Sequence, residues 1–334
     1  MKILNLYWHS VEPDSINPLY LDDLNPTASL FREHIKYIAD NYNPISISEY
    51  MEITSDKSLI RSYTKPPVVI GFDDGFKNVI KYALPVLNEY QVPAVFFVVG
   101  EILRNPDFVP WFVEMFHLMR KAERKSIVFD NVQIDLTSKQ SCRLLRRMVI
   151  NSIKGCTLEE DRQRLLTNLA GLVGVERPRA SDLEECLGFV SKEDLSNIGS
   201  DSLLTIASHG MTHRHLESLT YDEQVYELEQ SDLLLKEHCP SYYPVISYPD
   251  GSFNSDTIEI AKGVYRSGFA TSKNTSYANL YTYPRICIGY TTVQDLVYAT
   301  CFTFSKALLH PSRKTSFIRM NFLLPLKRFF HPNY

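Results

Sequence analysis

PPVVIGFDDG, residues 66–75, has the pattern of a buried β-strand that ends in two adjacent carboxylates. Apolar or small side chains at 68–72 follow two prolines, and such a continuous run is typical of a strand covered on both faces. Because side chains alternate along an extended chain, Asp73 and Asp74 point in different directions and can play two different roles. An Asp-Asp-Gly triplet alone is a weak signal, since a helix N-cap followed by a turn has the same sequence.

The rest of the chain repeats the succession of a strand and a helix. Further strand patterns lie at residues 3–7, 94–99, 203–208, 244–248 and 268–271, and helical patterns lie at 28–41, 79–87 and 220–237. Thr220 and Glu223 have the spacing of a capping box at the start of the last helix. The alternation predicts an α/β fold with a parallel sheet or a barrel, which binds ligands at the carboxyl ends of its strands.

Residues from about 101 to 188 interrupt this alternation with a mainly helical pattern. Basic residues cluster at 143–147 and acidic residues at 159–161. Opposite charges lie close together, so we interpret these clusters as solvated helix faces rather than a polyanion site. We therefore expect a barrel over residues 1–300, interrupted by a helical insertion at about 101–188, and a C-terminal extension at 301–334.

The composition excludes several classes of protein. The chain has 334 residues and a net charge of −4, so it has no general attraction to nucleic acid. Its six cysteines form no Cys-x-x-Cys pair, which argues against a zinc ribbon or a thioredoxin-like site. No export signal is visible, and the longest apolar run, 94–99, is far shorter than the roughly 20 residues of a spanning helix. We expect a cytoplasmic protein.

A histidine cluster follows the strand predicted at 203–208. SHGMTHRH, residues 208–215, places His209 and His213 four residues apart, a spacing that lets both imidazoles face one ion on a helical turn. Two histidines and one carboxylate make a familiar zinc set that leaves a coordination position open for water. His215 lies two residues beyond His213, and we expect this spacing to turn it away. The cluster indicates a hydrolytic metal site.

These two motifs resemble those of the polysaccharide deacetylases of carbohydrate esterase family 4, also called the NodB-homology domain. Residues 71–75 are similar to the first family motif, Thr-Phe-Asp-Asp-Gly, and residues 209–213 to the second, His-Ser/Thr-x-x-His. The resemblance implies Asp73 as general base and Asp74, His209 and His213 as ligands of a divalent cation. Zn²⁺ is the first choice, with Co²⁺, Ni²⁺ and Mn²⁺ as alternatives. The resemblance also implies a distorted (β/α)7-type barrel with a helical insertion.

The third family motif, Arg-x-Pro-Tyr-Gly, is changed here. SYPDG, residues 247–251, lacks its arginine and tyrosine and resembles the branch that includes poly-N-acetylglucosamine deacetylases. This resemblance implies that the backbone N–H of Asp250 helps to bind the oxyanion. We further hypothesise that Arg285 supplies the missing charge that orients Asp73.

The motifs of that branch are circularly shifted along the chain. LYWHSV, residues 6–11, resembles its opening Tyr-His-x-Val motif, whose histidine occupies the position of the general acid. The resemblance therefore implies that His9 protonates the leaving amine.

The expected function is hydrolysis of N-acetyl groups on an amino-sugar-containing glycan, either a bacterial surface polysaccharide or its precursor. Two alternatives stay open: an O-acetyl carbohydrate esterase, and an inactive glycan-binding or scaffold protein on a decayed barrel. The expected partner is an acetylated or lipid-linked glycan. Residues 317–334 mix apolar bulk with Arg319, Lys327 and Arg328, as interfacial anchors do, so packing on the barrel and peripheral contact with the inner membrane face are both open.

Overall fold

The computed structural model describes residues 3–16, 25–156, 158–183, 185–199, 202–271, 279–289, 292–297 and 299–300. The chain divides into two units, Met1–Val293 and Gln294–Tyr334, and the strands and the site lie in the first. The extension expected at 301–334 lies outside the described residues. Among the residues described, no helix is both long and apolar enough to cross a membrane.

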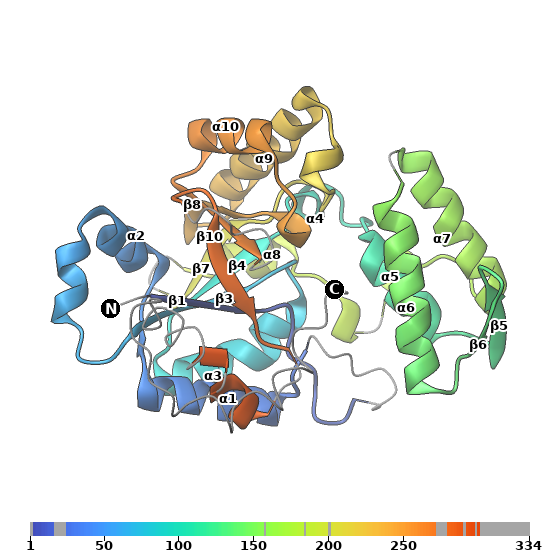
Figure 1. Cartoon of the computed structure of the whole chain (residues 1–334), viewed down its shortest axis with the longest axis horizontal. Helices are drawn as coiled ribbons and strands as arrows, with labels where there is room; N and C mark the ends of the chain where they lie inside the picture. Colours follow the sequence, from blue (N-terminus) through green and yellow to red (C-terminus); the bar gives the residue numbers. More distant parts are fainter. Residues whose placement is uncertain are drawn as a thin grey trace, which may run out of the picture. The chain divides into compact units, whose positions relative to one another are not determined.

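A closed parallel barrel forms the centre of the first unit (Figure 1). Within the described ranges its seven strands are β1 (Leu4–Trp8), β3 (Pro67–Phe72), β4 (Ala94–Val98), β7 (Leu204–Ser208), β8 (Tyr242–Ser247), β9 (Ser267–Thr271) and β10 (Tyr283–Cys287). They neighbour one another in the order β1-β10-β9-β8-β7-β4-β3, and the pairing of β1 with β3 closes the ring. A short strand, β2 (Asn43–Pro44), pairs with the start of β3. The predicted (β/α)7-type barrel is confirmed.

Strand β10 is not among the strands expected from sequence. Pro284 lies inside it, and a proline within an apolar run argues against a strand because it donates no backbone hydrogen bond. The strand nevertheless pairs with β9 on one side and β1 on the other. Only the closure of the barrel brings these partners to it.

The barrel helices follow their strands largely as the periodicity predicts. They are α1 (Ala28–Asn41), α2 (Ile47–Ser55), α3 (Leu84–Tyr90), α8 (Lys192–Ser196), α9 (Tyr221–His238) and α10 (Ser255–Val264). Short 3-10 turns are η1 (Lys57–Ser62), η3 (Ala180–Asp182), η4 (Glu185–Leu187), η5 (Leu216–Ser218) and η6 (Pro249–Gly251). Helix α9 begins at the predicted capping box, in which Thr220 and Glu223 each bond the other's backbone.

The segment 79–87, expected as one helix, begins with a π-helical turn. This turn, η2 (Val79–Ala83), leads into α3, and the Leu84 N–H bonds to Val79 O. Pro85 explains the change, because its ring has no N–H and clashes with the carbonyl of Lys81 in a regular α-helix. The wider turn separates these groups.

The interior of the barrel is closed by apolar side chains from neighbouring strands. Val69, Val95, Ala207, Val245 and Phe269 come from five successive strands and pack in one buried cluster with residues of α2. Because side chains alternate along a strand, the residues two and four positions after Val69 face the same interior. Those residues are Gly71 and Asp73, which places Asp73 at the carboxyl end of the barrel.

The insertion has a hydrophobic core of its own. It was expected to be helical, but it also contains two β-strands. It contains α4 (Glu101–Arg104), α5 (Trp111–Arg120), α6 (Lys139–Lys154), α7 (Glu159–Val173) and an antiparallel hairpin of β5 (Ser126–Phe129) and β6 (Val132–Asp135). The hairpin turns at Asp130 and Asn131, which both have positive φ, as a two-residue hairpin turn requires. Figure 1 shows α5, α6, α7 and the hairpin grouped together in green. The alternating residues Ile127, Phe129 and Ile134, all buried, are the signal for these strands.

Candidate metal centre and catalytic site

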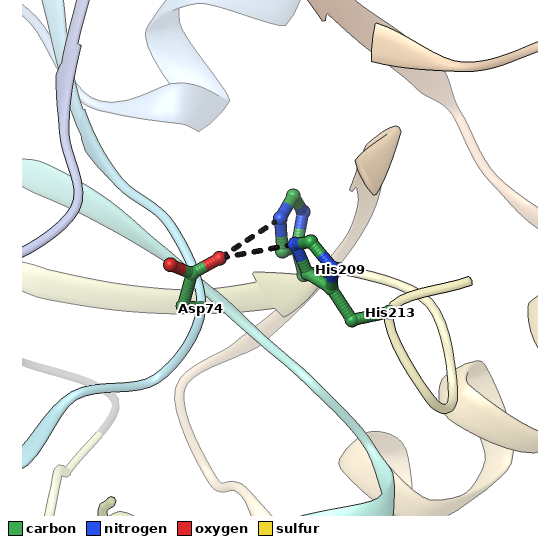
Figure 2. Close-up of side chains that lie close together, drawn as sticks. All are labelled: Asp74, His209 and His213. Atoms are coloured by element: carbon green, nitrogen blue, oxygen red, sulfur yellow. Dashed lines mark ion pairs between the residues drawn. The ribbon is translucent and has the colours of Figure 1, made fainter. Parts of the chain in front are cut away.

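Asp74, His209 and His213 come together at the carboxyl ends of β3 and β7. The Nε2 atoms of both histidines lie 3.3 Å from Asp74 Oδ1, and all three side chains are buried (Figure 2). One potential ligand atom from each residue lies within 4.8 Å of the others. These are the three residues expected to hold a metal.

The sequence pattern predicted both histidines on a helical turn, and the structure differs. They lie on the loop that follows β7, where Gly210 has a φ of 74° and His213 a φ of 58°. These left-handed residues fold the loop back, so that His213 returns to the carboxylate that His209 already faces. The four-residue spacing therefore brings the imidazoles together for a reason other than helical periodicity.

The hydrogen bonds of the site match the needs of a cation. His209 Nδ1 lies 2.7 Å from Ser247 O, and because a carbonyl only accepts, Nδ1 donates and a neutral ring turns its Nε2 lone pair toward Asp74. Asp74 Oδ1 has no hydrogen-bond partner among the described residues. The Asp74 carboxylate, the Nε2 lone pair of His209 and the imidazole of His213 thus converge in a buried site, which a divalent cation would satisfy. The residues present fit such an ion.

The charges of this centre influence one another strongly. Burial raises the pKa of Asp74, but the neighbouring imidazoles of His209 and His213 and the charge of His9 outweigh it and hold the pKa far below its usual range. Burial lowers the pKa of His213, but Asp74 outweighs it and raises that pKa. The carboxylate therefore stays ionised, the form that binds a metal.

Asp73 forms a two-pronged ion pair with Arg285 from β10. Arg285 Nη1 donates to Asp73 Oδ1 at 2.8 Å and Nη2 donates to Asp73 Oδ2 at 2.7 Å, and both side chains are buried. Ser247 Oγ lies 3.4 Å from Asp73 Oδ2 and also accepts from Arg285. Burial raises the pKa of Asp73, but the charge of Arg285 outweighs it and the pKa lies below its ordinary value. Arg285 thus contacts Asp73, as the orienting role expected of it requires.

Gly71 helps to make room for this arginine. The guanidinium lies 4.1 Å from the centre of the Tyr7 ring and 5.1 Å from that of Phe97. A Cβ on Gly71 would lie 3.5 Å from the Phe97 ring and 3.7 Å from Arg285 Nη1. A side chain larger than alanine at Gly71 would therefore press on the guanidinium.

His9 follows β1 and lies half-buried at the same end of the barrel, with its ring 5.5 Å from that of Tyr7. Burial lowers the pKa of His9, but Cys287 and the carboxylates of Asp74 and Asp73 outweigh it and raise the pKa to about 10. The expected general acid is therefore within electrostatic reach of both aspartates.

Asp250 lies on η6 with a φ of 53°, in the left-handed region. Its carboxylate accepts from His215 Nε2 at 2.5 Å and lies 3.5 Å from Lys154 Nζ at the end of α6. Burial raises the pKa of Asp250, but His215 and Lys154 outweigh it and lower that pKa. The sequence interpretation missed both partners: it set His215 aside and assigned Lys154 no role.

Glu227 on α9 is a further buried residue that the sequence interpretation missed. Its Oε2 accepts hydrogen bonds from the backbone N–H groups of Met211 at 2.9 Å and Thr212 at 2.8 Å, and its Oε1 accepts from the Thr212 hydroxyl. It thereby anchors the loop between the two histidines. Its pattern in the sequence is that of any glutamate on a helix, so no local signal marks it.

Two segments of the chain match a known protein family. Residues 61–136 and 180–265 match a family model described as polysaccharide deacetylase. A segment of 100 residues is 28% identical to the poly-beta-1,6-N-acetyl-D-glucosamine N-deacetylase of Escherichia coli K12; it makes up 30% of this chain and 14% of that protein.

Two solved structures have a similar fold. The Streptococcus pyogenes deacetylase PplD in complex with acetate has a TM-score of 0.57 and 17% identity, with 89% of this chain and 97% of that chain covered. IcaB from Ammonifex degensii has a TM-score of 0.53 and 14% identity, with 90% and 96% covered. The family model and the seven-stranded barrel together show that the chain belongs to the polysaccharide deacetylase family.

Proposed function

We propose that this protein is a metal-dependent hydrolase that removes N-acetyl groups from an amino-sugar-containing glycan, either a bacterial surface polysaccharide or its precursor. The observation that carries the proposal is the buried convergence of Asp74, His209 and His213 beside the Asp73–Arg285 pair. Three ligands and an adjacent carboxylate are what hydrolysis of an amide by a metal-activated water requires. The name of the matched Escherichia coli protein supports an N-acetylglucosamine polymer as the substrate class.

Asp74, His209 and His213 would hold the cation, for which Zn²⁺ is our first choice. When bound, such an ion polarises the acetyl carbonyl and lowers the pKa of water. Asp73 is the proposed general base, because a buried ionised carboxylate beside the ligands can accept the proton of the attacking water. Arg285 holds both carboxylate oxygens and so fixes the orientation of that base.

His9 is the proposed general acid. An amine leaves only when it is protonated, so the reaction needs a proton donor at the amide nitrogen. The backbone N–H of Asp250 is proposed to stabilise the oxyanion that forms on the acetyl carbonyl. The carboxylate of Asp250 is occupied by His215 and Lys154, which can hold this turn in place.

Metal stoichiometry and acetate release together test this proposal. We expect about one zinc-like ion per wild-type protein by elemental analysis, and loss of the ion in His209→Ala and His213→Ala. His238→Ala, at the far end of α9, is the matched histidine control and should keep the ion. Release of acetate from N-acetylglucosamine oligomers should follow metal content. A wild-type protein without metal after reconstitution, or with metal but inactive on N-acetylated glycans, would refute the proposal; release from O-acetylated glycans alone would favour the esterase.

A further inference from the structure

The insertion contacts the loops that carry the proposed catalytic residues. Its contacts are the ring of Phe112 with His213 (4.7 Å between centroids), Lys154 with Asp250 (3.5 Å), Arg120 with Glu12 (3.9 Å) and the Lys77 N–H with Gly188 O (2.9 Å). These contacts reach the loops that follow β1, β3, β7 and β8. The insertion is therefore part of the wall around the site.

A cavity of about 470 Å³ lies between the insertion and the barrel. Trp111, Gln163 and Arg177 line it from the insertion, and Thr212, Arg214 and Tyr226 line it from the barrel. Thr212 and Arg214 are the neighbours of His213 in the chain. The volume is in the range of small-molecule sites. The cavity thus borders the loop that carries His213, and none of the three proposed metal ligands lines it.

Each guanidinium group in the cavity wall is paired with a carboxylate. Arg177 Nη2 donates to Glu114 Oε2 at 2.9 Å, and Arg214 Nη1 donates to Glu223 Oε1 at 3.0 Å. Arg162 pairs in the same way with Glu159. The lining also includes Asp222 and Glu227, so five carboxylates and three guanidinium groups border the cavity. The paired groups offer fixed donors and acceptors side by side, and the remaining carboxylates offer further acceptors for hydroxyl groups. Such a wall suits a neutral ligand that carries many hydroxyl groups.

Aromatic side chains complete the chemistry of the wall. Trp111 and Tyr226 both border the cavity, from opposite sides of the junction between insertion and barrel. A sugar ring has an apolar face of C–H groups that packs on an aromatic ring, and hydroxyl groups at its edge that bond to carboxylates and guanidinium groups. The cavity wall contains both the aromatic rings and the charged groups that such contacts with a sugar need.

We propose that this cavity is a subsite for a second sugar residue of the glycan, adjacent to the residue whose acetamide is hydrolysed. This inference rests on the proposed function, since it names where the neighbouring part of that substrate binds. It makes the insertion a determinant of substrate length. Chains of several residues then bind better than a single N-acetylated sugar, because only they reach both sites.

Equilibrium binding tests the subsite without any need for turnover. The probes are N-acetylglucosamine and its β-1,4- and β-1,6-linked pentamers, titrated into metal-free protein by calorimetry. The test variant is Gln163→Ala/Tyr226→Ala, and the matched control is Tyr221→Ala, an exposed tyrosine on the same helix that does not line the cavity. Loss of one aromatic contact and one polar contact should weaken pentamer binding about tenfold. The control should bind as the wild type does, and both variants should keep the wild-type melting temperature.

Two results would overturn the subsite: equal pentamer affinity in the test variant and the control, or no preference of the wild type for pentamer over monosaccharide. Acetate release by metal-loaded protein is measured separately. Loss of pentamer preference in the variant, with unchanged turnover of the monosaccharide, supports the subsite. If the wild type binds pentamer through this cavity but releases no acetate, the proposed function is refuted and the subsite is not.

Discussion

Glu227→Ala removes the three hydrogen bonds by which α9 holds the loop between His209 and His213. The Glu227 side chain is buried, with an exposed fraction of 2%, and the N–H groups of Met211 and Thr212 both point at it. Alanine leaves these two donors without an acceptor. We expect the loop to lose the conformation in which both imidazoles face Asp74, and metal affinity to fall as a result.

The magnitude follows from the hydrogen bonds that are lost. A buried donor without a partner costs about 1–3 kcal/mol, so two donors cost roughly 2–6 kcal/mol. Burial raises the pKa of Glu227, which shows that the carboxylate itself is costly to bury, and its removal recovers part of this cost. We take about 2 kcal/mol as the net loss in loop stability. A competent loop conformation populated in about one molecule in 30 raises the apparent metal Kd about 30-fold.

Glu227→Gln separates hydrogen-bond geometry from charge. Its amide oxygen can still accept from both N–H groups, and its NH₂ group can donate to the Thr212 hydroxyl. We expect this variant to bind metal within about threefold of the wild type. Glu229→Ala, an exposed glutamate on the same helix, is the matched control and should have no effect.

Competition titration against a chromophoric chelator measures the metal Kd, and thermal melting in EDTA measures the metal-free fold. If Glu227→Ala binds metal with the same Kd as the wild type, the proposed anchoring of the loop is refuted. A Kd for Glu227→Gln as weak as that of the alanine variant would show that charge, rather than the hydrogen-bond geometry, sustains the site.

Arg285, His9 and the cysteines give three further predictions. Arg285→Ala leaves the buried Asp73 carboxylate without its partner and should lower the free energy of unfolding by about 3–5 kcal/mol, measured by urea denaturation; an unchanged midpoint contradicts this. His9→Ala should lose most acetate release and keep the metal, because we propose this residue as a proton donor and not as a ligand; a wild-type rate would exclude it as the acid. Cys287 is exposed and should be alkylated by iodoacetamide at pH 8, whereas Cys239, whose pKa burial raises to about 12, should be protected in the folded protein, as peptide mass spectrometry can determine.

Much of the barrel could be predicted from sequence because its elements depend on local patterns. The continuous apolar run before Asp73 becomes β3, and the capping box at Thr220 begins α9. The meeting of Asp74 with His209 also follows from a general rule, since the carboxyl ends of parallel strands lie at one end of a barrel. The hairpin β5–β6 was not predicted, because its two strands of four residues are too short to stand out between the helical patterns of α5 and α6.

The amino-acid sequence shows which residue types are available for the site and where along the chain they stand. Which of them come into contact depends on the tertiary structure. Arg285 reaches Asp73 because β10 closes the ring against β1, and Lys154 reaches Asp250 because the insertion packs on the barrel. Glu227 accepts a hydrogen bond from the loop between His209 and His213 because α9 packs beside that loop, and no local sequence pattern predicts this contact. Such contacts join residues far apart in the chain, so they depend on strand register and helix packing rather than on periodicity or propensity.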